Sequence, residues 1–161
     1  MMQLIPFTET HCDLLIQWIP DQDFNYLWGG PAYQWPLDSE QISRHIARED
    51  VFPYLLLDQE EPAGFIELIQ TGKRKFRICR VLIARPESRG QGKGEMLMRL
   101  VMDIATNEYR AKEFELSVFQ HNQSAVSCYR NLGFTTFSME PLKHEQSGYE
   151  SWVRHKMKLN A

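Results

Sequence analysis

The sequence predicts an α/β or α+β sandwich in which helices pack on a central mixed sheet. Three observations support this fold class: short apolar runs that alternate like strands, amphipathic stretches with helical spacing, and a glycine-rich loop that joins one strand to the strongest helix. The expected order is strand, helices, strands, helix, strand, helix, strands. Nothing in the chain indicates a domain boundary, so we expect residues 1–161 to form one domain.

The first third of the chain is expected to supply one strand and three helices. Helices tend to begin after a capping side chain and to stop before proline. Pro20 fits such a stop, and Asp21 fits the cap of the next helix. The predicted elements are a strand over residues 2–7, helices over residues 8–18, 21–28 and 36–50 (with Asp38 or Ser39 near the start of the last), and a turn at Gly29-Gly30-Pro31.

The middle of the chain is expected to form three strands followed by a long helix. The strands cover residues 53–57, 63–70 and 76–84, with turns at residues 59–62 and 72–73. The helix follows the glycine-rich loop. Its apolar residues recur at i, i+3, i+4, i+7 and i+8, which places them on one face: Leu97, Leu100, Val101, Ile104 and Ala105.

The last third is expected to form a strand, a helix and two final strands. Residues 114–119 alternate between two faces, as a strand does. Asn122 is expected to cap the following helix, and Gly133 is expected to end it in the left-handed conformation. The last two strands are predicted over residues 134–137 and 149–159.

The stretch from Arg89 to Gly94 is the best candidate for a ligand site. Its three alternating glycines stand between a strand and a helix, so the backbone can approach a ligand closely. Unpaired amides at the start of a helix carry partial positive charge and bind phosphate. Arg85, Arg89 and Lys93 add full positive charges, so the loop is predicted to bind a pyrophosphate.

Two common phosphate-binding fingerprints do not fit this loop. The dinucleotide pattern G-x-G-x-x-G fails because its last position falls on Glu95 or Leu97. The P-loop fails because Lys93 is followed by Gly94 instead of serine or threonine. A nucleotide-binding regulatory module is therefore disfavoured.

What remains is Arg-x-x-Gly-x-Gly, which resembles the acetyl-CoA-binding motif of the GCN5-related N-acetyltransferase (GNAT) superfamily. A second block, residues 122–134, resembles that family's Asn…Ala…Tyr…Gly-Phe segment. The two blocks stand in the family's order and span residues 76–137. The resemblance implies a mostly antiparallel sheet with helices on both faces, and acetyl transfer from acetyl-CoA to a primary amine.

The resemblance also implies which residues hold the cosubstrate. Backbone amides of the glycine loop would bind the diphosphate, and the end of the preceding strand would pair with the pantetheine arm, offering an oxyanion-type donor to the thioester. In the family this strand splays from the next one. The implied cosubstrate-binding residues are Leu82, Ile83, Ala84, Arg89, Gly90, Gln91, Gly92, Lys93, Gly94, Glu95, Asn122 and Tyr129.

Tyr129 is the implied catalytic acid, because the family places a tyrosine here beside the sulfur of the cofactor. A phenol with a pKa near ~10 suits protonation of a departing thiolate. The base for the amine is less defined. A branch of the family carries a glutamate near position 117, where this chain has Ser117; Glu67 is the first candidate, with Glu115 or a chain of waters as alternatives. Cys128 lacks a histidine placed to activate it, so direct transfer in a ternary complex is expected.

The acceptor is expected to bind against the aromatic front half of the chain, with Trp28 and Tyr33 as the best candidates. The nearby Asp21, Asp23 and Asp38 would suit a cationic amine. A protein N-terminus, a lysine, a polyamine, an amino acid and an amino-sugar antibiotic all stay open. So do two other functions: a transferase for a different acyl-CoA, and a non-catalytic acyl-CoA sensor.

Composition narrows the class of protein further. The formal net charge of −3 argues against a general nucleic-acid binder. No apolar run approaches ~20 residues, and no secretory signal is visible, so no membrane span is expected. Three scattered cysteines suggest reduced thiols in the cytoplasm. No metal-ligand spacing occurs, so no metal is expected, and a homodimer is possible because dimers are common among relatives.

Overall fold

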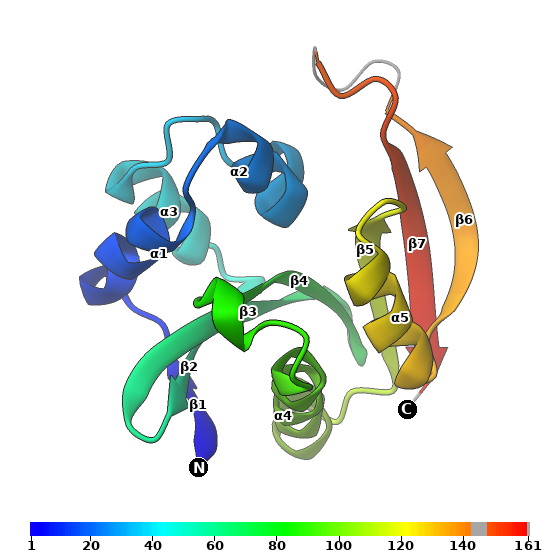
Figure 1. Cartoon of the computed structure of the whole chain (residues 1–161). Coiled ribbons are helices and arrows are strands. Elements are labelled where there is room, and N and C mark those ends of the chain that lie inside the picture. The colour runs from blue at the N-terminus through cyan, green and yellow to red at the C-terminus, as the bar shows by residue number, and fades with distance from the viewer. Residues whose placement is uncertain (143–147, 161) are drawn as a thin grey trace.

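The computed structural model describes residues 1–142 and 148–160 and contains one seven-stranded sheet with the strand order β1-β2-β3-β4-β5-β7-β6 (Figure 1). The strands are β1 (Met2–Pro6), β2 (Val51–Asp58), β3 (Glu61–Gly72), β4 (Lys75–Ile83), β5 (Glu113–Phe119), β6 (Thr135–Pro141) and β7 (Val153–Asn160). The helices are α1 (Cys12–Trp18), α2 (Gln22–Gly29), α3 (Ser39–Ile46), α4 (Lys93–Tyr109) and α5 (Gln123–Asn131). Short 3-10 turns cover Glu9–His11, Gly30–Ala32 and Pro86–Ser88.

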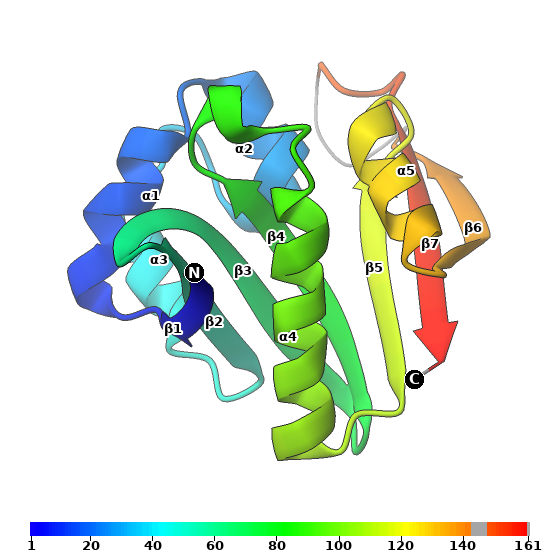
Figure 2. The same cartoon turned by 60° about the horizontal axis from the view of Figure 1, so that its bottom comes forward.

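Neighbouring strands are antiparallel except β4 and β5, which are parallel. Helices α1 to α3 lie over one face of the β1–β4 half, and α4 crosses the opposite face (Figures 1 and 2). Helix α5 lies beside β5 and β7 on the α4 side (Figure 2). The predicted mixed, mostly antiparallel sheet with helices on both faces is confirmed.

Within the described residues, two apolar cores lie between the helices and the sheet, and a third cluster contains Tyr26, Phe119, Leu142 and Tyr149. The larger core joins α4 and α5 to the sheet and contains the predicted helix residues Leu97, Val101 and Ala105, all buried. The smaller core lies between α1–α3 and the first four strands, around Leu15 and Phe65. Strands β2, β3 and β4 therefore bury side chains on both faces.

Some predicted boundaries were wrong. Helix α3 is shorter than residues 36–50, because the Asp38 side chain caps it by accepting from the Gln41 amide at 2.9 Å, and the chain turns into β2 after Ala47. Strand β6 runs past residue 137 because its pairing with β7 continues to Pro141. Strand β7 begins later than residue 149, because the amide of Trp152 bonds back to Tyr149 in a turn.

Strand β4 carries a bulge at Arg80. Its pairing with β3 shifts by one residue between Cys79 and Leu82, and Arg80 has a φ of 54°, in the left-handed region. Ile78, before the bulge, is buried in the larger core, whereas Leu82, after it, is buried in the smaller core. The extra residue thus changes which face each later side chain occupies.

Strands β4 and β5 separate close to the bulge. Their parallel pairing extends only from Lys75 with Glu113 to Ile78 with Leu116. Past that point the two ribbons diverge and open a gap in the middle of the sheet (Figure 1). The separation of these strands, which the sequence suggested only through a family resemblance, is present in the structure.

Gly64 on β3 is required by the close approach of β4. A Cβ atom at this position would overlap the carbonyl oxygen of Leu82, which belongs to the backbone and cannot rotate away. We expect Gly64→Ala to lower the free energy of unfolding by about 2 kcal/mol, measured by urea denaturation. Gly72→Ala on the same strand is the matched control, because its Cβ would lie 3.2 Å from the Lys75 Cβ. An equal loss in both variants would contradict the expectation.

Candidate active site

A cavity of about 670 Å³ occupies the gap between β4 and β5. Side chains reach it from both faces of the sheet, with Tyr129 of α5 on one side and Trp28 of α2 on the other. Predicted site residues that line it are Trp28, Leu82, Ile83, Arg89, Gly90, Gly92, Gly94, Glu95, Asn122 and Tyr129. Predicted site residues outside the lining are Tyr33, Glu67, Ala84, Gln91 and Lys93.

The glycine loop enters helix α4 with an open backbone. Gly90 and Gly92 have φ values of 78° and 79°, and Gly92 is the N-cap of α4, where no side chain caps the first turn. A Cβ atom on Gly90, Gly92 or Gly94 would meet nothing within 4 Å. Packing within the described chain therefore does not explain Gly94, and the loop leaves room for a ligand against the amides of the first turn.

The charged side chains of the loop divide into two groups. Arg89 lines the cavity, donates from Nε to the Ile83 carbonyl at 3.0 Å, and lies 5.0 Å from the Phe24 ring. Lys93, in contrast, pairs with Asp58 at 3.1 Å. Of the three cations predicted to surround the glycine loop, Arg89 lines the cavity, whereas Arg85 and Lys93 do not.

Two further predicted positions have partners within the protein. Gln91 donates to the Glu87 carbonyl at 3.1 Å. The amide of Ala84 donates to Ala63 at 2.9 Å and extends the pairing of β4 with β3. Neither Gln91 nor Ala84 lines the cavity. The residues between β4 and α4 that do line it include Leu82 and Ile83 at the end of β4 and the glycines of the loop.

Tyr129 lies at the end of the cavity next to the larger core. Its side chain is 8% exposed and meets the Phe134 ring edge-on, with 6.3 Å between centroids. Burial raises the pKa of Tyr129 above its usual value, with smaller contributions from the Cys128 and Cys79 thiols. The phenol therefore stays protonated near neutral pH and can donate a proton.

Asn122 and Cys128 also line this end of the cavity. Asn122 occupies the N-cap position of α5, as predicted, but the predicted side-chain cap was wrong: its Oδ1 accepts from the Ser124 hydroxyl at 3.5 Å instead. Its side chain is thus not committed to the helix amides. Burial raises the pKa of the Cys128 thiol, which disfavours a thiolate nucleophile.

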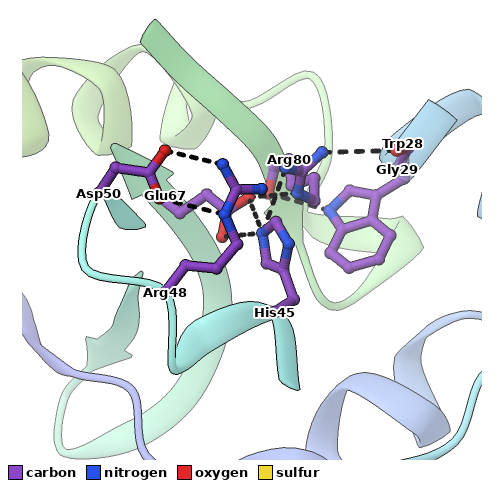
Figure 3. Close-up of polar contacts among 7 residues, drawn as sticks. All are labelled: Trp28, Gly29, His45, Arg48, Asp50, Glu67 and Arg80. Carbon is purple, nitrogen blue, oxygen red and sulfur yellow. Dashed lines mark hydrogen bonds and ion pairs between the residues drawn. The ribbon is translucent and has the colours of Figure 1, made fainter. Parts of the chain in front are cut away.

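A buried polar network lies behind the bulge of β4 (Figure 3). Glu67 is fully buried and forms an ion pair with Arg80. Nε2 of His45 lies 3.0 Å from Glu67 Oε1 and 3.2 Å from Arg80 Nη2. Arg80 also reaches α2, because Nη1 donates to the Gly29 carbonyl at 3.4 Å and its own carbonyl accepts from Trp28 Nε1 at 2.9 Å.

This network changes the interpretation of Glu67. A general base needs a lone pair directed at the substrate, whereas this carboxylate faces Arg80 and His45 and does not line the cavity. Sequence reasoning missed both partners. Arg80, between Cys79 and the apolar run Val81-Leu82-Ile83, was a usable signal, because a buried cation needs a carboxylate nearby.

The aromatic and acidic candidates for the acceptor are distributed unevenly. Trp28 lines the cavity, while Tyr33 is buried behind it, 5.8 Å from the Trp28 ring and 5.3 Å from the His45 ring. None of the three aspartates that the sequence suggested near a cationic amine lines the cavity. Asp21 and Asp38 cap helices α2 and α3, and Asp23 accepts from the Tyr149 hydroxyl at 2.9 Å.

Within residues 1–142 and 148–160, no group of three or more metal-ligating side chains is close enough to hold a metal ion. In the same part of the chain, no helix combines the length and the apolar character needed to cross a membrane.

Comparison with known proteins shows the family to which the chain is related. The model of the acetyltransferase (GNAT) family matches residues 15–134. An N-acetyltransferase 9-like protein of Nematostella vectensis is 20% identical over 148 residues, which cover 84% of this chain and 75% of the relative. The spermidine N(1)-acetyltransferase of Escherichia coli K12 is 27% identical over 97 residues, which cover 60% of this chain and only 52% of that enzyme.

Solved structures show the same fold. The spermidine N-acetyltransferase of Vibrio cholerae, in complex with CoA and spermine, superposes with a TM-score of 0.81 at 16% identity, covering 99% of this chain and 95% of that one. The aminoglycoside acetyltransferase AAC(6')-Ib in complex with coenzyme A gives a TM-score of 0.77 at 18% identity, with the same coverage.

Proposed function

Because the chain belongs to the acetyltransferase (GNAT) family, we propose that its cavity brings acetyl-CoA and an amine together for direct transfer in a ternary complex. The protein is an acetyl-CoA-dependent N-acetyltransferase, and acetyl-CoA supplies the activated acetyl group. The observation that carries the proposal is the glycine loop. Its open backbone at the start of α4 lies at one end of a cavity whose other parts hold a protonated phenol and an aromatic wall.

Residues on the cavity wall have separate roles in binding the cosubstrate, protonating the leaving sulfur and holding the acceptor. The amides of Gly92 to Glu95 and the guanidinium of Arg89 bind the diphosphate. Backbone groups of Leu82 and Ile83, beside the gap that β5 leaves open, hold the pantetheine arm. Tyr129 donates its proton to the leaving sulfur, and its raised pKa keeps that proton available. Trp28 forms part of the wall for the acceptor.

The amine must lose its proton without help from Glu67. That carboxylate is held by Arg80 and His45, and Glu115 pairs with Arg77 at 3.1 Å. Neither lines the cavity. We infer that water in the cavity carries the proton to solvent, and that Glu67 acts by holding Arg80, and through it the end of α2, in place.

Gly94 gives the sharpest test of the cosubstrate site. Gly94→Val should fold normally, because the position needs no positive φ and its Cβ meets nothing within 4 Å. We expect the variant to bind acetyl-CoA roughly 10-fold more weakly or worse, because the side chain displaces phosphate from the helix amides. Isothermal titration with acetyl-CoA measures the loss.

Met96→Val is the matched control for this substitution. It puts the same residue into the first turn of α4 at an exposed position outside the cavity lining. Its affinity for acetyl-CoA should equal that of the wild type. Unchanged binding by Gly94→Val would remove the basis of the proposal.

A non-catalytic acyl-CoA sensor is the second candidate function. It would use the same loop and bind acetyl-CoA with the same affinity. It would release no coenzyme A with any amine, whereas the enzyme releases free thiol when its acceptor is added. The buried, protonated Tyr129 at the cavity favours the enzyme.

We also propose that the protein works in the cytoplasm. Within the described residues, Cys12, Cys79 and Cys128 are all free thiols. Burial raises the pKa of the Cys79 thiol to about 12. Unpaired cysteines are typical of proteins in a reducing compartment, which supports a place in the cytoplasm.

A further inference from the structure

A closed network of contacts lies behind the wall of the cavity, and four of its five side chains are drawn in Figure 3. The members of this Trp28 network come from different parts of the fold: Trp28 of α2, Tyr33, His45 of α3, Glu67 of β3 and Arg80 of β4. Trp28 and Arg80 line the cavity, whereas the other three are buried behind it. Those three can therefore act on a bound acceptor only through Trp28 or Arg80.

The indole of Trp28 is held on two sides. Its Nε1 donates to the Arg80 carbonyl at 2.9 Å, and its ring stacks on Tyr33 with 5.8 Å between centroids and 11° between planes. An indole has a single N–H, so the hydrogen bond fixes where its polar edge points, and the stack fixes its plane. The carbonyl is supplied by the bulge of β4, where Arg80 has a φ of 54°.

His45 joins the polar members of the network to the aromatic ones. Its Nε2 lies 3.0 and 3.1 Å from the two carboxylate oxygens of Glu67. Because an ionised carboxylate only accepts, this nitrogen carries the hydrogen and donates it. The same imidazole meets the Tyr33 ring edge-on, with 5.3 Å between centroids. One side chain of α3 thus holds both the carboxylate that pairs with Arg80 and the ring that supports Trp28.

Tyr33 is fixed to α2 through its backbone. The buried Asn25 of α2 donates from Nδ2 to the Tyr33 carbonyl at 3.1 Å. Within the described residues, the Tyr33 hydroxyl is buried without a hydrogen-bond partner. The aromatic ring of Tyr33, and not its hydroxyl, therefore makes the contacts that close the network.

We propose that His45 and Tyr33 are positioning residues for the acceptor, because the network that they close fixes the Trp28 indole as a rigid part of the acceptor wall. This inference rests on the proposed function, in which Trp28 belongs to that wall. A wall that is ordered before the acceptor arrives lowers the entropy cost of binding. Loss of the network should therefore raise KM for the acceptor, while the chemical step at Tyr129 keeps its rate.

Kinetics with a named acceptor test the role of His45. Coenzyme A release with spermidine, phenethylamine and phenylalanyl-glycine identifies the best of these three amines for the wild type. With that amine, His45→Leu should raise KM roughly 10-fold and change kcat by less than about 2-fold. His45→Gln is the conservative variant, because its amide can donate to Glu67 from the place of Nε2. It should return KM to within about 3-fold of the wild-type value.

Matched variants separate the network from the rest of the fold. Tyr33→Leu should raise KM as His45→Leu does, and Tyr33→Phe, which keeps the ring, should restore it. Arg44→Leu is the control on α3, because Arg44 is exposed and pairs with Glu40 at 2.9 Å. It should keep the wild-type KM. An acetyl-CoA thermal shift equal to that of the wild type verifies that each variant is folded.

Hydrogen exchange of the Trp28 indole N–H is a second measurement and needs no acceptor. Its NMR signal is assigned by its disappearance in Trp28→Phe. The hydrogen bond to the Arg80 carbonyl protects this hydrogen in the wild type. We expect exchange at least about 10-fold faster in His45→Leu, because the local structure opens more often, and unchanged exchange in Arg44→Leu.

Three results bear against these proposals. Wild-type KM or wild-type indole exchange in His45→Leu would refute the inference. A loss of kcat with unchanged KM in that variant would also refute it, by indicating a part in proton transfer. If the wild type releases no thiol with any of the three amines, the indole measurement alone decides the inference. Absence of an acetyl-CoA thermal shift as well would refute the proposed function itself.

Discussion

Glu67→Gln should lower the free energy of unfolding by about 3 kcal/mol, because it leaves the Arg80 guanidinium buried without its counter-ion. The glutamine amide fills the same space as the carboxylate. The loss of stability therefore measures the missing charge more than any change in packing. Urea denaturation measures it. Arg80 also contacts the Gly29 carbonyl, so we expect acceptor KM to rise as α2 shifts.

Two further variants make this result decisive. Glu115→Gln breaks the more exposed pair with Arg77 and should cost less than about 1 kcal/mol. Combining Glu67→Leu with Arg80→Met should recover most of the lost stability, since apolar replacements leave no unpaired charge. A Glu67→Gln variant with wild-type stability and KM but a large loss of kcat would instead identify Glu67 as the base.

Tyr129→Phe should lower kcat by roughly 100-fold while leaving the affinity for acetyl-CoA unchanged, because it removes only the hydroxyl that we propose protonates the leaving sulfur. The phenyl ring keeps the edge contact with Phe134. Thiol release gives kcat, and titration calorimetry gives the affinity. Tyr109→Phe removes a phenol at the end of α4, outside the cavity lining, and should leave both unchanged.

The pH dependence of the wild type tests the same role. Burial raises the pKa of Tyr129, so its acidic form is retained across the range in which a free tyrosine begins to ionise near ~10. The rate should therefore rise with pH as the amine loses its proton, without a falling limb below about pH 10. A decline between about pH 7 and 9 would contradict a role for this phenol as the acid.

Local pattern was enough to predict most of the fold. Helix α4 was predictable because its apolar spacing repeats from Leu97 to Ala105, and Leu97, Val101 and Ala105 are all buried. The bulge at Arg80 was not predictable, because it depends on the register with β3, which partner strands decide together. The cap of α3 was expected at Asp38 or Ser39, and Asp38 is the cap, but the early end of the helix was not predicted.

The predicted site residues also divide into those that a short motif places and those that depend on distant partners. Gly92, Gly94 and Tyr129 line the cavity because short motifs fix where a loop or helix places them. Lys93 and Glu67 do not, because their partners Asp58 and Arg80 lie far away in sequence and are brought close only by the folded sheet. A motif predicts backbone position well, whereas the direction of a long charged side chain depends on its distant counter-ion.

The divergence of β4 and β5 has a consequence for the order of events in the reaction. Since the cavity is lined from opposite faces of the sheet, the diphosphate site proposed beside α4 and the acceptor site proposed beneath α2 lie on different sides. On this proposal, we expect each reactant to bind without displacing the other, so that either one can bind first.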